Sequence, residues 1–593
     1  MTLALVDWLI IISYLILSVA IGLFYTRKAG KNSESFFLGG RNLPWWIAGT
    51  SMVATTFAAD TPLAVTELVG KNGISGNWLW WSFLTGGMLT VFFFARLWRR
   101  ANILTEVEFI ELRYSGKEAS FLRGFKGIYL GLIMNVVILG WVNLAMVKIL
   151  MVFFGMDKTT ALYYTAGLMM FTAIYSSLSG LLGVAMTDVV QFIIAMTGCI
   201  VLAVIVVNSD KIGGIEGLKQ KLPNDLLGFF PSTKSAESSG TNIPQTFALS
   251  IGTFLAFFGV QWWSSWYPGA EPGGGGYVAQ RMMSTKTEKD SIYATLFFQI
   301  THYCLRPWPW ILVGLCSLVL YPDLSMADKG QGFVMAMKEF LPTGLKGFLL
   351  VAFLAAYMST LSTQLNWGTS YIVNDVYRRF YRKQTSFSSN EKAEKHYVKA
   401  GRIMTMVLMI ISLIVTTQLE TISRAWEFVM ECGAGLGGVL IVRWYWWRVN
   451  AWSEIAATFS PFIYYTVSKY LLHLEYPNGF FLTVGCTTLT WIIVTLMTKP
   501  SDEKHLEEFY KRITPGGWWE PVRIKANMQK TKWQLMNLVV CWLSAVAMTY
   551  CVLFCIGSFI FHNYLPSLYY GIAALTSFFL LKMFVSKTKI FGD

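Results

Sequence analysis

Long apolar runs separated by short polar segments set the pattern of this chain from one end to the other. A helix that crosses a bilayer needs about 20 mostly apolar residues, and runs of this length recur throughout the sequence. The pattern predicts about fifteen membrane-spanning helices. Their expected ranges are 5–26, 43–69, 76–98, 126–154, 160–179, 185–208, 246–266, 292–321, 345–377, 399–417, 424–447, 452–473, 479–498, 534–560 and 565–584.

Two of the predicted spans contain residues that interrupt a helix. In the second span, the stretch MVATTFAADTPLAVT places Asp60 and Pro62 in the middle of the run. At the end of the seventh, residues 268–276 read PGAEPGGGG, which cannot continue a regular helix. Irregular backbone at membrane depth is tolerated where protein encloses it or where it lines a wet cavity, so Asp60 and Glu271 are candidate site residues. The alternative for 273–276 is a flexible turn just beyond the helix.

Each interrupted span begins a group of five predicted spans. Because five is odd, the two groups enter the membrane from opposite sides, which is typical of secondary transporters built from inverted repeats. The predicted fold is an all-α polytopic membrane protein with an inverted five-helix-repeat transporter bundle, one N-terminal extra helix and about four C-terminal extra helices. The expected divisions are an extra span and cytoplasmic linker (1–42), the first repeat (43–208), an outside loop (209–245), the second repeat (246–447) and C-terminal extra spans (448–593) with a cytoplasmic loop (499–533).

Composition and charge support a membrane protein and fix its expected orientation. Charged residues make up only 14% of the chain, against about 25% in soluble proteins. The net charge of +14 predicts no nucleic-acid partner, because Lys and Arg concentrate in alternate loops, as the positive-inside rule requires. We therefore expect a multi-pass protein of the cytoplasmic membrane, with the N-terminus outside and the C-terminus in the cytoplasm. The basic loops are 27–41, 99–125, 378–398 and 499–533.

A cluster of hydroxyl groups stands out in the ninth predicted span, where residues 355–366 read AAYMSTLSTQLN. At 3.6 residues per turn, Ser359 and Thr363 share a face, and hydroxyl oxygens suit a small hard cation. The alternative is that these hydroxyls bond to their own backbone or join neighbouring helices. The five His follow no metal-binding or catalytic spacing, and the eight Cys fall in apolar runs as buried thiols. We expect no enzyme and no organic cofactor.

Three stretches carry a family resemblance: SFFLGGRNLPWWIAGTSMVAT (35–55), SGLLGVAMTDVVQ (179–191) and FLAAYMSTLSTQLNWGTSYIVNDVY (353–377). Over about residues 5–500 the chain resembles the sodium:solute symporter family, which includes the sodium–glucose and sodium–sialic acid transporters. The resemblance implies a sodium-coupled symporter that imports a sugar, a sugar acid or a similar polar metabolite by alternating access. The alternative is a sodium-independent uniporter or a solute-sensing membrane protein of the same fold.

The resemblance also implies where sodium, the coupling ion, would bind. The principal site would use three backbone carbonyls and two hydroxyls, from Ala54, Phe57, Ala356, Ser359 and Thr360. Half-helix C-terminal ends and unwound carbonyls suit a cation. A possible second site matches Asp188, Ser359, Ser362 and Thr363. Alternatively, Asp188 caps the N-terminus of the sixth span.

The solute side departs from the sugar-transporting members, so the solute stays open. The Trp-rich seventh span either stacks on a solute ring or lies at the membrane interface. Arg306 either pairs with a solute carboxylate or pairs structurally with Glu427 or Glu271. The candidate solute-binding residues are Asp60, Thr61, Trp80, Trp81, Trp263, Tyr267, Glu271, Tyr303, Arg306 and Glu427.

Overall fold

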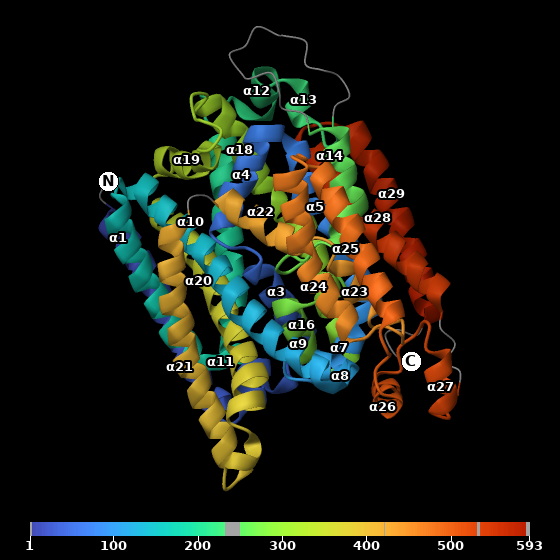
Figure 1. Ribbon diagram of the computed structural model, residues 1–593. Coiled ribbons are helices and arrows are strands. Elements are labelled where there is room, and N and C mark those ends of the chain that lie inside the picture. Colours follow the sequence, from blue (N-terminus) through green and yellow to red (C-terminus); the bar gives the residue numbers. More distant parts are fainter. Residues whose placement is uncertain (1–2, 232–248, 420–421, 530–533, 589–593) are drawn as a thin grey trace.

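The protein is a bundle of helices whose long axes run roughly in one direction (Figure 1). The structure, a computed structural model, describes residues 3–231, 249–419, 422–529 and 534–588. Within these ranges every named element is a helix, and β-pairing is limited to two isolated bridges. The predicted all-α fold is therefore confirmed.

Ten helical segments in the described part are long and apolar enough to cross a membrane. Most are continuous over a whole predicted span, and several contain short π-helical turns. These segments are α1 (Leu5–Ala29), η2 to α7 (Ile74–Ala101), α9 to α10 (Gly116–Phe154), α11 (Lys158–Val207), α17 to α18 (Glu288–Leu320), α20 to η8 (Leu345–Tyr381), α21 (Asn390–Gln418), α25 (Asn478–Met497), α28 (Leu535–Ile560) and α29 (Tyr564–Thr588).

The other predicted spans are interrupted or short helices. The second span divides into α3 (Trp45–Thr55) and α4 (Asp60–Asn72). The seventh comprises α14 (Ile251–Leu255), η5 (Ala256–Gln261), α15 (Trp262–Ser264) and, after a glycine-rich loop, α16 (Gly276–Ser284). The eleventh divides into α22 (Ile422–Cys432) and α23 (Gly437–Val442), and the twelfth is α24 (Ala451–Thr466) with η10 (Val467–Leu471).

The long helix α11 contains two predicted spans joined at Gly180. Gly180 has φ 57° and ψ −167°, a conformation that a residue with a Cβ rarely adopts. A Cβ there would also lie 2.8 Å from the carbonyl oxygen of Phe36. Glycine therefore lets the chain change direction here while it packs closely on the segment that precedes α3.

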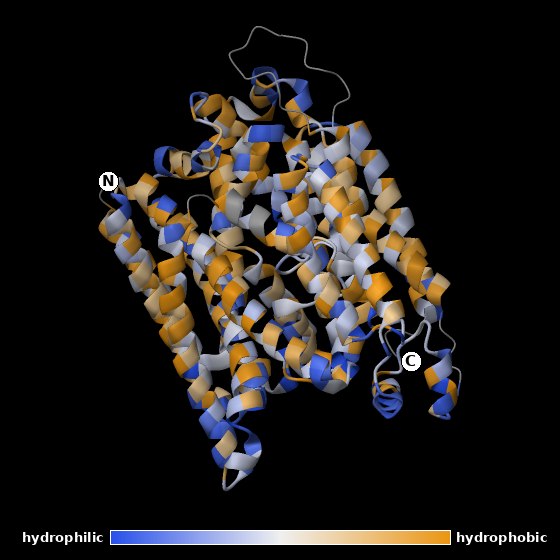
Figure 2. Ribbon diagram, viewed as in Figure 1, coloured by the Kyte–Doolittle hydropathy of each residue, from blue (hydrophilic) through white to orange (hydrophobic). Residues whose placement is uncertain are grey.

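Apolar side chains cover the outside of the bundle, as expected for lipid contact. Helices α25, α28 and α29 are largely apolar along their length, and α21 is apolar except for its charged first part, whereas α26 (Glu503–Ile513) and α27 (Glu520–Lys525) are more polar (Figure 2). The segments that hold the basic loops, η8 to α21 and α26 to α27, lie at one end of the bundle, and α12 (Gly214–Lys221) lies at the other (Figure 1). All eight Cys are free thiols, and Cys486, Cys551 and Cys555 are only partly buried.

Ion pairs fix the basic end of the bundle. Glu454 on α24 is fully buried and accepts hydrogen bonds from Arg443 (3.0 Å), Tyr114 (3.0 Å) and Lys126. Outside the membrane spans, Glu111 accepts from Arg379, Ser120 and Arg123. Burial would raise the pKa of Glu111, but these hydrogen bonds lower it to about 2. Glu111 thus ties the segment before α9 to η8, and Glu454 ties α24 to α9 and to the end of α23.

Candidate functional site

The interrupted helices meet in the middle of the bundle. The break between α15 and α16 pairs with the break between α22 and α23, because Gly435 donates its amide to the carbonyl of Ser264 (2.9 Å) and Trp266 donates to that of Gly433 (3.3 Å). The first break, at residues 56–59, borders the same region. Unwound segments leave backbone carbonyls and amides free to bind ions and solutes.

The hydroxyl cluster of α20 faces the C-terminal end of α3. Helices α3 and α20 pack together, and Thr360 donates its hydroxyl to the carbonyl of Thr55 (2.9 Å), with the carbonyl of Ala356 at 3.3 Å. The hydroxyl and these carbonyls are oxygen ligands of the kind a hard cation prefers. Ala356 and Thr360 of the predicted principal sodium site meet at this junction, but the α3 carbonyl that Thr360 contacts is that of Thr55. The predicted ligand Ala54 accepts from the amide of Phe57, and Ser359 donates to Asp188.

Asp188 lies beside this junction and connects α11 to α3 and α20. Its side chain is fully buried and accepts hydrogen bonds from Ser51 (2.5 Å) and Ser359 (2.7 Å). Asp188 lies in the interior of α11, beyond the turn at Gly180. It therefore does not cap a helix N-terminus, and the capping alternative is wrong.

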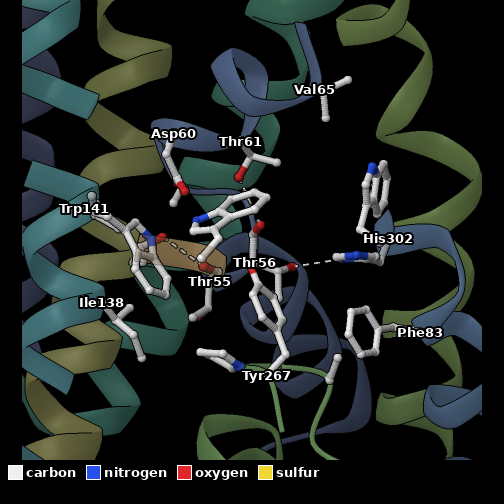
Figure 3. A pocket seen from close by; sticks show the side chains of 18 of the residues that line it. Thr55, Thr56, Asp60, Thr61, Val65, Phe83, Ile138, Trp141, Tyr267 and His302 are labelled. Carbon is white, nitrogen blue, oxygen red and sulfur yellow. Dashed lines mark hydrogen bonds between the residues drawn. The ribbon is translucent and has the colours of Figure 1, made fainter. Parts of the chain in front are cut away.

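A cavity of about 110 Å³ lies next to the two predicted ion sites. Figure 3 shows Asp60 and Thr61 on one side of it, with Thr55, Thr56 and Tyr267 across from them and His302 at one end. At about 30 Å³ for each water in the liquid, the volume corresponds to roughly four waters, which fits one small polar molecule. Aromatic rings form much of the wall: Trp80, Phe83, Trp141, Tyr267, Tyr303 and Trp426.

Arg306 is buried in the cavity wall, and protein acceptors hold most of its guanidinium. It donates to the hydroxyl of Thr56 (2.5 Å), to the carbonyls of Thr56 (2.9 Å) and Val53 (3.1 Å), and it lies 2.9 Å from Nδ1 of His302. The guanidinium also stacks over the ring of Trp310 at 5.1 Å. These contacts brace the end of α3 against α18.

Asp60 contributes the cavity's carboxylate, and one of its oxygens is unpaired. The residue is 2% exposed, and Oδ1 has no hydrogen-bond partner in the described part of the chain. Asp60 is the first residue of α4, where the helix dipole favours a negative charge. The helix therefore stabilises a carboxylate that keeps a free acceptor toward the cavity.

A larger cavity of about 760 Å³ adjoins the central one from the end of the bundle where α12 lies. The two cavities share the side chains of Leu68, Leu79, Trp426 and Met430, which form a thin apolar partition. Toward the basic end, Trp98 donates to the carbonyl of Gly273 (2.9 Å), and Glu106 accepts from the amide of Gly276 (2.5 Å). These bonds hold the glycine-rich loop, whose residues 268–270 line the central cavity, in place on the side of the basic end.

A family model, "Sodium:solute symporter family", matches residues 36–458. The chain belongs to the sodium:solute symporter family. Relatives in this family include a sodium/glucose cotransporter from Vibrio parahaemolyticus, 23% identical over 84% of this chain and 92% of the relative. The chain is also similar to the sodium/sialic acid symporter SiaT from Proteus mirabilis, 22% identical over 84% of this chain and 95% of the relative.

A solved structure of a Na⁺-coupled sialic acid symporter, in a substrate-bound outward-open state, has a similar fold. Its TM-score is 0.66 at 19% identity, and the match covers 84% of this chain and 99% of that chain. The inverted-repeat transporter bundle predicted from helix breaks is therefore confirmed. The match also agrees with a multi-pass membrane transporter, as the rest of the family is.

The structure brings together six of the predicted solute-binding residues of this family member. Asp60, Thr61, Trp80, Tyr267, Tyr303 and Arg306 line the central cavity. Trp81, Trp263 and Glu271 do not line it. Trp81 packs against Trp78 and Phe554, Trp263 donates to its own helix at Gly259, and Glu271 accepts from the amide of Gly269 within the glycine-rich loop. The side chain of Glu427 lies outside the described residues.

Several cavity residues were not predicted from the sequence. Trp141 and Trp426 come from long apolar runs, where nothing distinguishes them from lipid-facing or packing residues. Gln364 lies in the hydroxyl-rich stretch 355–366 but was not among the expected solute-binding residues. A sequence signal does exist near Trp426. The glycine-rich stretch GAGLGG at 433–438 predicts a break in the helix that carries this residue, and broken helices border binding sites. Arg281, which contacts the predicted ion ligands, follows the second break in the stretch YVAQR but had no assigned partner.

Proposed function

We propose that this protein couples inward sodium flow to the uptake of a small, neutral, polyhydroxylated solute by alternating access across the cytoplasmic membrane. The observation that carries the proposal is that the hydroxyl-lined junction and the cavity share a wall. Thr55 and Thr360 line the cavity, and the hydrogen bond between them joins α3 to α20. An ion bound at this junction would fix the wall against which the solute packs, so each would tighten binding of the other.

The chemistry of the cavity favours a neutral polyol or sugar ring over a sugar acid. The two terminal nitrogens of Arg306 bond to Thr56, Val53 and His302, so within the described residues only its Nε is left for a solute carboxylate. Asp60 has a free acceptor for solute hydroxyls. The aromatic walls suit the apolar face of a ring, as in sites that bind one small polar molecule. Relatives named for glucose and myo-inositol agree with this class.

The proposed membrane orientation follows the basic loops. These loops lie at the end of the bundle opposite α12, so the positive-inside rule places that end in the cytoplasm. The 760 Å³ cavity then opens on the outside, and solute would enter past Leu68, Leu79, Trp426 and Met430. The N-terminus of α1 would lie outside and the C-terminal end of α29 in the cytoplasm.

Thermal stability of the purified protein tests the proposed function. Sugars, cyclitols, sugar acids and amino acids would be added in sodium buffer and again in potassium buffer. We expect neutral sugars or cyclitols to raise the melting temperature in sodium only, because a ligand that binds the folded state stabilises it. Equal stabilisation in both salts would instead indicate a uniporter or a sensor. Stabilisation by sugar acids alone would contradict the proposed solute class.

Thr360→Ala should raise the sodium concentration that half-saturates uptake. The variant removes one neutral oxygen ligand, whose contribution of about 0.5–1.5 kcal/mol corresponds to roughly a 2- to 13-fold change. Thr360→Ser keeps the hydroxyl and serves as the matched control. If both variants need the same sodium concentration as the wild-type protein, Thr360 is not part of the sodium site.

A further inference from the structure

The guanidinium of Arg281 occupies the centre of the predicted second ion site. Arg281 is fully buried on α16, and each of its nitrogens has a different partner. Nε donates to the hydroxyl of Ser51 (3.1 Å), one terminal nitrogen donates to Gln280 (2.8 Å), and the other donates to the hydroxyl of Thr363 (2.7 Å). The last nitrogen also lies 3.8 Å from a carboxylate oxygen of Asp188.

These partners include the groups that would bind a second sodium ion. Asp188 and Thr363 are predicted ligands, and Ser359 is held by Asp188 at 2.7 Å. The fourth predicted ligand, Ser362, bonds to the carbonyl of Ser359 (3.0 Å). Asp188 is the carboxylate that accepts hydrogen bonds from hydroxyls of this site. One carboxylate compensates one cation, and two unit cations a few ångströms apart in a buried site repel strongly.

Arg281 lies on α16, which directly follows the glycine-rich loop. The loop before α16 contains Gly273 and Gly274, with φ of 79° and 77°, and Gly276, the first residue of α16, has φ 55°. After α16, the amide of Leu43 donates to the carbonyl of Ser284 (3.0 Å), and the amide of Lys286 donates to that of Leu43 (3.2 Å). Leu43 directly precedes α3, so α3 and α16 are tied together, whereas Asp188 and Thr363 belong to α11 and α20.

We propose that the Arg281 guanidinium is a built-in competitor for the second sodium ion. It joins Ser51, Asp188 and Thr363 when the ion is absent, and it leaves Asp188 and Thr363 when the ion binds. Because Arg281 is carried by α16, occupancy of this site is coupled to the position of α16 relative to α11 and α20. This inference rests on the proposed sodium coupling and adds a residue that sets the affinity and timing of the second ion.

The melting temperature, measured without solute while sodium replaces potassium at constant ionic strength, tests this role. Arg281→Gln keeps hydrogen-bonding groups but removes the charge. We expect the sodium concentration for half-maximal stabilisation to fall about tenfold, within the usual range of coupling between two bound groups. Arg281→Lys keeps a cation on the same helix, and it should stay close to the wild-type value. An unchanged or higher sodium requirement in Arg281→Gln would overturn the proposal.

Recovery of folded Arg281→Gln in sodium and in potassium gives a second test of the proposal. If sodium replaces the guanidinium, Arg281→Gln should be recoverable when it is purified throughout in high sodium, even where it aggregates in potassium. Failure to recover it in both salts would make Arg281 a structural brace and overturn the proposal. A wild-type protein that is insensitive to sodium would instead defeat the proposed function itself, so the two failures are distinguishable.

Discussion

Asp60→Asn should weaken solute binding by at least about tenfold, because a hydrogen bond to a charged group contributes about 1.5–3 kcal/mol. Among the residues that the structure describes, none donates a hydrogen bond to Oδ1 of Asp60, which faces the cavity, so solute hydroxyls are its expected donors (Figure 3). The amide keeps the shape and one acceptor but loses the charge. The solute concentration that half-saturates sodium-dependent stabilisation is the measurement.

The sodium response should survive in Asp60→Asn, because the carboxylate is not among the oxygens proposed for either ion site. A matched control is Asp7→Asn. Asp7 is also a buried carboxylate, but it accepts hydrogen bonds from the amides of Gly344 and Gly347 (2.8 Å each) at the start of α20. This control should lower the melting temperature and leave solute affinity unchanged. Unaltered affinity in Asp60→Asn would remove Asp60 from the solute site.

The fold could be predicted from the sequence because lipid constrains it so strongly. Apolar runs must be helices at membrane depth, and prolines or clustered glycines mark where such a helix breaks. The stretches around Asp60 and at 268–276 therefore predicted the two central breaks. The third break, at 433–436, also contains glycines, but no proline or charged residue interrupts the apolar run there. The hydropathy pattern therefore predicted α22 and α23 as one span.

The site was less predictable because its contacts join residues far apart in the chain. Asp188 and Arg281 come within 3.8 Å although 93 residues separate them, and no local pattern pairs them. Arg306 was expected to pair with a carboxylate, yet the end of α3 supplies carbonyls and a hydroxyl instead. Carbonyls and a hydroxyl at the end of α3, not an acidic side chain, accept from its terminal nitrogens. Backbone partners of this kind are exposed only where a helix ends, and tertiary packing determines where it ends.

Glu454→Gln should destabilise the protein by about 3–5 kcal/mol, the usual cost of breaking a buried ion pair by removing one partner. Glu454 is fully buried and neutralises Arg443 and Lys126 at the basic end of the bundle. Glutamine keeps an acceptor for Tyr114 but leaves both cations less compensated. Thermal unfolding in detergent measures the loss. Glu391→Gln is the control, because its pair with Lys395 is exposed and water screens it.

A second substitution separates lost charge compensation from a simple packing defect. Lys126→Met in the Glu454→Gln background removes one of the two cations, and Arg443 retains Glu106 at 4.0 Å. If the cost arises from uncompensated charge, the double variant should be more stable than Glu454→Gln alone, because residues in one buried network do not act additively. If instead the two losses add, the carboxylate acts through packing and shape, and the ion pairs do not hold α24 against α9 and the end of α23.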